Sequence, residues 1–167
     1  TQEVIGIVLS TGSGSNTVSN NTIANLNNNY SGTDNNGQIR GIVLSAGHSG
    51  NTISGNTIYN LSTTSANANA NSEASVIGIS QNQTSTSHTV TQNIVHSLSS
   101  AAGSANVEVT GIYFDGTSSS TATSAVSRNS VHSLTASTSG TAVINGINVN
   151  RSTVGSYANN LIRLGID

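Results

Sequence analysis

The chain has no cysteine, proline, methionine, tryptophan or lysine, and only 6% of its 167 residues are charged. The absence of cysteine excludes disulfide bonds and thiolate metal sites. The formal net charge of −2 provides neither a basic surface for nucleic acid nor an acidic tail. Because no run of 18 apolar residues occurs, we expect no membrane insertion. No motif indicates a cofactor.

Serine, threonine, asparagine and glycine fill most of the chain. Few charges and many small polar residues can indicate disorder. Here, however, isoleucine, valine and leucine recur at regular intervals, which a disordered chain has no reason to maintain. We therefore expect one folded domain, and we expect it to be a piece of a longer protein.

Two short motifs recur together along the chain. The first is an apolar residue, any residue, Gly and Ile, as in Ile39–Ile42; the second resembles Asn51–Leu61, N-T-I-S-G-N-T-I-Y-N-L. The repeat interval is about 35 residues through five copies, which is a strong repeat signal. The glycines are Gly6, Gly41, Gly78, Gly111 and Gly146, and the asparagines that follow them are Asn21, Asn56, Asn93, Asn129 and Asn160.

The repeat predicts an all-β parallel β-helix with three short strands per coil. Its apolar runs are short, β-branched and bounded by Gly, Ser and Asn, which favours strands over helical repeats. Propeller blades usually carry aromatic residues, and this chain has only four Tyr and one Phe. Equivalent residues would stack about 4.8 Å apart in successive coils. The expected coils are 1–36, 37–73, 74–107, 108–142 and 143–167.

The two repeated residues suggest structural roles. Ile39 and Ile42 are three positions apart and cannot share one unbroken period-2 face, so we expect a bend at Gly41. The repeated Asn would mark a corner, because Asn tolerates left-handed backbone and its side-chain amide can bond the amides above and below. No amphipathic capping helix is evident, so both end coils would present open strand edges to neighbouring copies.

These features resemble the right-handed parallel β-helix proteins of the pectate-lyase-like superfamily, especially bacterial secreted and cell-surface members. Stacked Ile/Val positions, the Asn ladder and N-T-I-x-x-N-x-I-type repeats carry the resemblance over nearly the whole chain. It implies a right-handed coil, consistent with the handedness of parallel crossovers. Enzymes of this superfamily use clustered carboxylates, often with a metal ion. The acidic residues here occupy different repeat positions, so we expect no catalytic residues, no metal and no enzyme activity.

A polar patch beside the Gly-Ile strand is the best candidate for ligand binding. We expect a planar ring, amides, a carboxylate and an arginine there, which together could contact a sugar or polysaccharide. The alternative is that these side chains are polar only because outward positions of a β-helix are polar. The candidate residues are Tyr113, Asp115, Asn82, Asn148, Asn150 and Arg151.

Two other sets of side chains form candidate arrays. His96 and His132 share a repeat position, between Tyr59 and Arg163, and could either bind a metal or form an exposed stack. Outward Thr and Ser residues of the second strand form ranks like those of β-helical ice-binding proteins, although Ser, Ala and Gly interrupt them. The threonines of this possible ice-binding array are Thr17, Thr52, Thr89, Thr91 and Thr153.

The function expected from these observations is a non-catalytic structural or adhesive repeat module. It would act as a stalk or spacer of a bacterial surface or secreted protein, located outside the cell. The alternative is a carbohydrate-binding or polysaccharide-processing β-helix. A self-assembling filament subunit and an ice-binding protein are more distant hypotheses.

Overall fold

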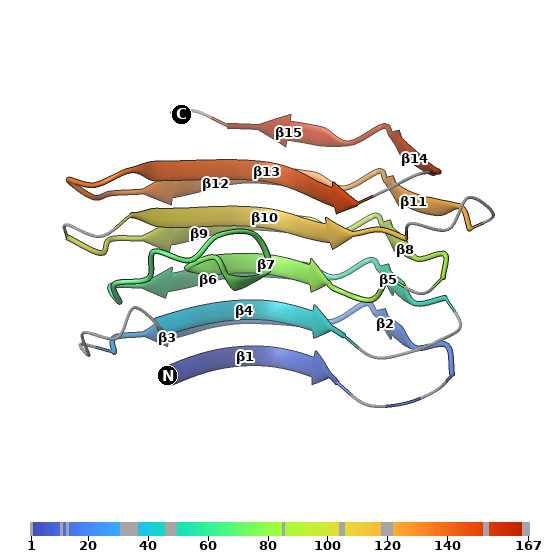
Figure 1. Ribbon diagram of the computed structural model, residues 1–167, viewed down its shortest axis with the longest axis horizontal. Helices are drawn as coiled ribbons and strands as arrows, with labels where there is room; N and C mark the ends of the chain where they lie inside the picture. Colours follow the sequence, from blue (N-terminus) through green and yellow to red (C-terminus); the bar gives the residue numbers. More distant parts are fainter. Residues whose placement is uncertain are drawn as a thin grey trace.

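A computed structural model describes residues 2–10, 12, 14–30, 37–45, 50–84, 86–103, 106–117, 122–151 and 154–164. The described strands form three parallel sheets of five strands each (Figure 1). Sheet A contains β1 (Gln2–Leu9), β4 (Gly37–Leu44), β7 (Val76–Gln81), β10 (Val107–Asp115) and β13 (Ala142–Arg151). Sheet B contains β2 (Thr17–Ser19), β5 (Thr52–Ser54), β8 (Thr89–Thr91), β11 (Ser124–Ser127) and β14 (Gly155–Ala158). Sheet C contains β3 (Thr22–Asn28), β6 (Thr57–Thr63), β9 (Ile94–Ser100), β12 (Ser130–Ala136) and β15 (Leu161–Arg163).

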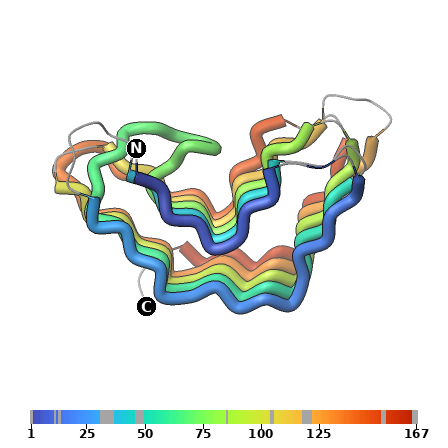
Figure 2. The backbone as a smooth tube through the Cα atoms, turned by 90° about the horizontal axis from the view of Figure 1, so that it is seen from below, coloured from blue at the N-terminus to red at the C-terminus, as the bar shows by residue number. Residues whose placement is uncertain are grey.

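The three sheets wind into one right-handed tube. In Figure 1 the strands of sheet A run left to right across the front, and those of sheets B and C return behind them as the chain climbs. Seen along the axis, successive coils superpose (Figure 2). The predicted parallel β-helix with three strands per coil is confirmed. Among the described residues, no helix is long and apolar enough to cross a membrane.

Aliphatic side chains fill the tube in vertical ranks. Ile42, Ile79 and Ile112 are direct partners in adjacent strands of sheet A and are fully buried. They belong to one continuous core cluster with side chains from sheets B and C, including Ile53 and Ile58. Because each β-branched residue packs on its equivalent in the next coil, the 35-residue repeat becomes a continuous core.

The repeated glycine places the backbone close to the core. Ile39, Ile42 and Leu44 lie in the core, so the alternation of inward and outward residues shifts by one at Gly41. A Cβ added at Gly41 would lie 2.5 Å from the Gly78 carbonyl oxygen and 2.7 Å from the Ile58 Cγ2. No real side chain fits there, which explains why glycine recurs at this bend.

The corner between sheets B and C differs from the prediction in one respect. The left-handed residue is the one before each ladder asparagine, whereas the ladder asparagines are not left-handed. The asparagine therefore serves the corner through its side chain, and its neighbour supplies the backbone turn. The left-handed residues are Asn20, Gly55, Gln92, Arg128 and Asn159, with φ of 57°, 66°, 57°, 57° and 57°.

The segment 64–75, which we call the β6–β7 loop, folds back over the outer face of sheet A (Figures 1 and 2). It contains the short helix η1 (Asn71–Glu73). Its Ala74 forms a second buried apolar cluster with Ile77 of β7 and Tyr113 of β10. Outward-facing residues near the middle of sheet A are therefore covered, which period-2 alternation does not predict.

Candidate functional site

An asparagine ladder runs along the corner between sheets B and C, as predicted. The backbone N–H and side-chain Nδ2 of each of the first four members donate to the Oδ1 of the asparagine in the next coil, with all eight distances at 3.0 Å. The Nδ2 of Asn93 also donates to the Ile53 carbonyl of the preceding coil at 3.0 Å. One amide side chain thus joins three coils, and low dielectric inside the corner strengthens such bonds. The members are Asn21, Asn56, Asn93, Asn129 and Asn160.

A second ladder lies at the corner where the chain enters sheet B. The backbone N–H of Asn16 donates to Asn51 Oδ1 at 3.1 Å, and the N–H of Asn51 donates to His88 Nδ1 at 3.0 Å. The N–H of His88 then donates to Ser124 Oγ at 3.1 Å. Sequence reasoning missed this ladder because its members differ in type. Their shared feature is a side-chain acceptor at one repeat position. This position directly precedes the register partners Thr17, Thr52, Thr89 and Ala125 on sheet B.

His88 is therefore a buried hydrogen-bond acceptor. Its Nδ1 accepts the Asn51 N–H, so the ring must be neutral with its proton on Nε2 for this bond to exist. Burial lowers the pKa of His88, and the backbone of Gln83 opposes that effect. The imidazole takes the place of the asparagine amide in the ladder and introduces a titratable group at this corner.

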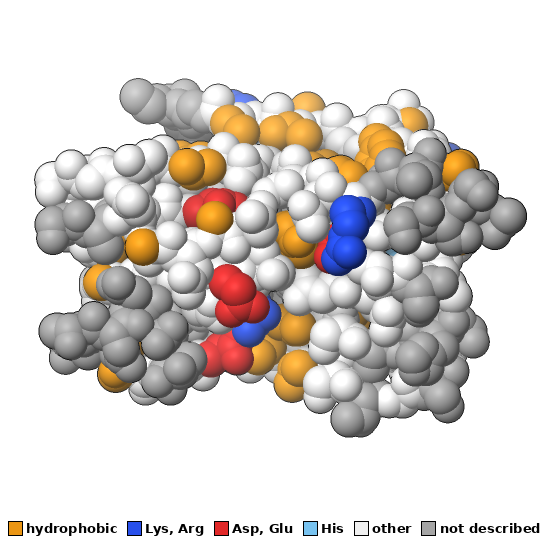
Figure 3. All heavy atoms as spheres, viewed as in Figure 1, with side chains coloured by type: hydrophobic (Ala, Val, Ile, Leu, Met, Phe, Trp, Pro, Cys, Tyr) orange, Lys and Arg blue, Asp and Glu red, His pale blue; other side chains and the backbone are white. Residues whose placement is uncertain are grey.

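Charged side chains gather on one side of the molecule. Figure 3 shows acidic and basic groups on the face formed by sheet A and the β6–β7 loop. Four of the six acidic residues occur on these elements, and Asp34 and Asp167 lie outside the described residues. Two arginines accompany them. The residues of this charged face are Glu3, Glu73, Glu108, Asp115, Arg40 and Arg151.

Arg40 is the centre of the first charged group. Its guanidinium forms an ion pair with Glu3 in the preceding coil and donates to Gln38 Oε1 at 3.3 Å. Gln38 in turn donates to a carboxylate oxygen of Glu73 at 2.9 Å. Burial lowers the pKa of Arg40, whereas the nearby Glu73 carboxylate raises it. These contacts fasten the β6–β7 loop to β4.

Glu108 forms a second attachment point for the same loop. One carboxylate oxygen accepts bonds from Thr110 Oγ1 at 2.9 Å and from Asn145 Nδ2 at 3.0 Å. The other accepts the backbone N–H of Asn71 in η1 at 3.2 Å. Glu108 is 7% exposed, and both of its carboxylate oxygens accept bonds from neutral donors.

The residues predicted to bind a sugar come together only in part. Asp115 accepts two bonds from Arg151, Nε to Oδ1 at 2.9 Å and Nη2 to Oδ2 at 2.8 Å. A register shift after Phe114 places Arg151, not Asn150, opposite Asp115, although Asn150 Nδ2 still reaches Asp115 Oδ1 at 3.3 Å. Nearby, Asn82 Oδ1 accepts a bond from Ser80 Oγ at 2.8 Å.

Tyr113 does not offer an open ring to a sugar. It lies opposite Asn148, as predicted, but it is only 2% exposed because Ala74 of the β6–β7 loop packs with it and Ile77. Burial raises the pKa of Tyr113, and the Asp115 charge adds to that effect. A ligand arriving from solvent would meet the polar groups of Asn150 and Arg151.

The two repeated histidines stack as a ladder. Ring centroids are 5.1 Å apart for Tyr59 and His96 and 4.9 Å apart for His96 and His132, with interplanar angles of 2° and 6°. The Nδ1 of His96 is bonded to the Ser97 hydroxyl. Burial, followed by the His132 ring, lowers the pKa of His96. Parallel rings aim their nitrogens in the same direction, and no group of three His or carboxylate residues that could hold a metal exists in the described parts of the chain.

The threonine array is shorter than predicted. Thr17, Thr52 and Thr89 are direct partners on sheet B, but the rank continues as Ala125 and Ser156. Gly155, expected as one of the interruptions in the second rank, instead pairs with Ser124. Thr153 lies outside the described residues. The segment between sheet A and sheet B is shorter in the final coil, from Arg151 to Gly155, than in the coil before it, from Asp115 to Ser124. The residues that pair on sheet B in the final coil therefore differ from those expected from the repeat.

Comparison with known proteins identifies no relative: no family model, curated protein or solved structure matches this chain. The parallel β-helix is therefore established by its strand pairing and ladders alone.

Proposed function

We propose that this chain is a non-catalytic structural module, a short length of rod that acts as a stalk or spacer. The observation that carries this proposal is the continuity of bonding along the axis. Apolar ranks and two polar ladders join the coils, with strand pairing in all three sheets. A load applied along the axis would be shared by many parallel bonds in each coil.

The state of the carboxylates supports a role without catalysis. Acid–base chemistry needs a carboxyl group that can reach a substrate and exchange a proton. Asp115 accepts bonds from two guanidinium nitrogens of Arg151, Glu108 accepts bonds from three donors, and Glu3 forms an ion pair with Arg40. These groups stabilise strands and loop, which is what a structural role requires of them.

The proposed setting is a bacterial secreted or cell-surface protein related to the pectate-lyase-like superfamily. This part of the proposal comes from the resemblance of the repeats, N-T-I-x-x-N-x-I, and from the right-handed coil seen in Figure 1. An extracellular rod also accords with the low charge content of the chain, in which only 6% of residues are charged.

Pulling on single molecules tests the mechanical role. Because the chain lacks cysteine, handles can be attached through Gln2→Cys and Leu164→Cys, near the two ends of the tube in Figure 1. We expect force peaks as coils unwind, each releasing about 120 Å of chain for about 35 residues. Asn93→Ala should lower the peak force. Extension without any force peak would contradict the proposal.

Glycan binding is a second candidate, favoured by the concentration of charged groups on one face. Arg151 is exposed over 58% of its side chain and is oriented by Asp115. If this face binds polysaccharide, Asp115→Ala and Asn150→Ala should both abolish glycan-array binding, while Thr52→Ala on sheet B should not.

Ice binding by the shortened threonine array of sheet B is tested by thermal hysteresis of the purified chain. The absence of thermal hysteresis at high protein concentration would end that hypothesis.

A further inference from the structure

We propose that His96 and His132, neighbours on the outer face of sheet C, bind one oxyanion between them. The oxyanion is a carboxylate, sulfate or phosphate group, either free or carried on an acidic polymer. This inference goes beyond the proposed rod function, because it concerns a ligand on the side of the tube and not the resistance of the tube to force.

The two histidines occupy the same repeat position on the outside of the tube. They belong to β9 and β12, which are neighbours in sheet C and lie behind sheet A in Figure 1. Val95 and Val131 pair with each other and lie in the core. Because successive residues of a strand face opposite sides, His96 and His132 pair on the outer face. Both residues are half-buried, so each side chain keeps some contact with solvent.

A serine after each histidine fixes the orientation of the ring. The Nδ1 of His96 is bonded to Ser97 Oγ and the Nδ1 of His132 to Ser133 Oγ, both at 3.0 Å. Both serines have a left-handed backbone with φ of 55°, so the local turn is the same in the two coils. A hydroxyl group can donate to the Nδ1 of a neutral ring or accept the Nδ1–H of a charged ring. In either state Nε2 carries a proton and is a hydrogen-bond donor.

The two Nε2–H groups are spaced for an oxyanion and not for a metal ion. Among the hydrogen bonds of the described residues, none involves the Nε2 of His96 or His132. The ring centroids are 4.9 Å apart and the ring planes differ by 6°, so the two Nε2 atoms point the same way at a similar separation. Two oxygens of one oxyanion lie closer together than this, and each can accept an N–H bond of about 2.8 Å. Two nitrogens bound to one metal ion at about 2.1 Å lie at most about 4.2 Å apart.

The charges around the pair favour an anion. Arg163 is the register partner of His132 in the next coil, and Arg128 is exposed at the corner that leads into β12. Every acidic residue that the structure describes lies on sheet A or the β6–β7 loop, and none lies on sheets B or C. Tyr59 stacks on His96 at 5.1 Å, so the ring faces are engaged and only ring edges meet a ligand. Single-stranded nucleic acid, which stacks its bases on aromatic faces, therefore has no platform here.

Binding of the anion is linked to uptake of protons. Burial, followed by the His132 ring, lowers the pKa of His96. An oxyanion between the rings offsets the repulsion of two imidazolium ions and so stabilises their charged forms. Anion binding should therefore strengthen as the pH falls through the range in which imidazole titrates, near about 6.5. Tyrosine and arginine side chains, the other titratable groups beside the pair, titrate well above this range.

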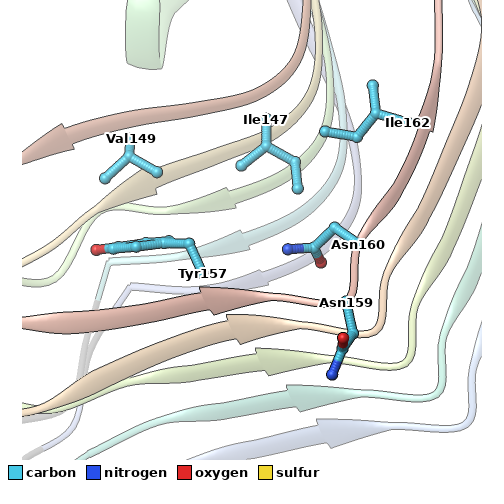
Figure 4. A pocket seen from close by; sticks show the side chains of 6 residues that line it. All are labelled: Ile147, Val149, Tyr157, Asn159, Asn160 and Ile162. Carbon is cyan, nitrogen blue, oxygen red and sulfur yellow. The ribbon is translucent and has the colours of Figure 1, made fainter.

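The hollow shown in Figure 4 is a poor place for the same anion. Its volume is about 400 Å³, and aliphatic side chains and the ring of Tyr157 project toward it. No charged residue lines it, so nothing there compensates an anion for the loss of water. The lining residues are Ile147, Val149, Tyr157, Asn159, Asn160 and Ile162.

Titration with inorganic sulfate tests the proposal, since sulfate keeps its double charge between pH 5 and pH 8. Calorimetry at these two pH values and constant ionic strength gives the affinity and the number of ions bound. The variants are His96→Gln, His132→Gln and the double substitution. His88→Asn, which removes a buried imidazole at another corner, is the matched control. Far-UV circular dichroism verifies that the strands of each variant have formed.

We expect one sulfate ion per chain, bound about tenfold or more tightly at pH 5 than at pH 8, in the unmodified chain and in His88→Asn. Each single substitution should remove most of the binding and the double substitution no more, because one ion needs both rings. Absence of sulfate binding at pH 5 would overturn the proposal. Two ions per chain, of which each single substitution removes one, would also overturn it.

Dextran sulfate distinguishes the two sources of the oxyanion. Tighter binding of dextran sulfate than of free sulfate, lost in both single substitutions, identifies a group carried on an acidic polymer. Equal affinity per sulfate group, also lost in both, identifies the free ion. Binding of dextran sulfate that neither substitution weakens would contradict the assignment of the site to this pair.

Discussion

Replacing one ladder asparagine by alanine should have an effect that depends on its place in the ladder. Asn93 is fully buried, and its Oδ1 accepts bonds from both the N–H and the Nδ2 of Asn56. Its own Nδ2 donates to the Ile53 carbonyl at 3.0 Å. Asn93→Ala therefore leaves the Asn56 N–H and the Ile53 carbonyl without these partners inside the corner.

The magnitude follows from those two groups. An unsatisfied buried donor or acceptor costs about 1–3 kcal/mol, so Asn93→Ala should lower the free energy of unfolding by roughly 2–6 kcal/mol. Asn21→Ala is the matched control. Asn21 lies in the first coil, its Oδ1 accepts no ladder bond from the described residues, and Asn56 Oδ1 keeps the bond from the Asn21 backbone N–H. Its loss should be under about 1 kcal/mol.

The assay is equilibrium unfolding in guanidinium chloride, followed by far-UV circular dichroism on dilute protein. Equal losses for Asn93→Ala and Asn21→Ala would refute the reasoning, because both variants remove the same atoms and differ only in the ladder bonds that depend on them.

Three further predictions concern other parts of the fold. Burial lowers the folded-state pKa of His88, so as the pH drops the unfolded chain binds a proton before the folded chain does. The free energy of unfolding should therefore decrease as the pH falls below about 6.5. His88→Asn should make that decrease smaller when unfolding is measured at pH 7.5 and at pH 5. Gly78→Ala would place a Cβ against Val95 and 2.6 Å from the Gly111 carbonyl oxygen, so the free energy of unfolding should decrease by about 1–3 kcal/mol or more. In the control Gly14→Ala the new Cβ meets no atom within 4 Å, so the free energy of unfolding should hardly change. Asp115→Asn removes an ion pair whose arginine is largely exposed to solvent, so its loss of stability in the same assay should be smaller than that of Asn93→Ala. An equal or larger loss would contradict this ranking.

The architecture was predictable because the repeat encodes it directly. Ile42, Ile79 and Ile112 recur at one interval, and stacking them in register accounts for the core, the glycine bend and the Asn93 ladder without further information. Each of these features depends on contacts between equivalent residues, which a repeated sequence displays.

The charged face was not predictable in the same way. Glu73 and Asn71 belong to a loop with no counterpart in other coils, so no repeat indicates that the loop folds back onto β4 and β10. The burial of Tyr113 follows from that loop and reverses the exposure expected from strand alternation. The second ladder escaped notice because Asn51, His88 and Ser124 share acceptor chemistry and not residue type.

Disulfide trapping in the cysteine-free chain tests the coil stacking most directly. Thr52 and Thr89 are direct partners in neighbouring strands, so their Cα atoms should lie about 4.8 Å apart, within the range that a disulfide can bridge. The account predicts that Thr52→Cys/Thr89→Cys forms an intramolecular disulfide on mild oxidation. Thr52→Cys/Thr91→Cys, offset by two residues to about 8 Å, should remain reduced. Efficient bridging of the offset pair but not of the aligned pair would contradict the stacked tube.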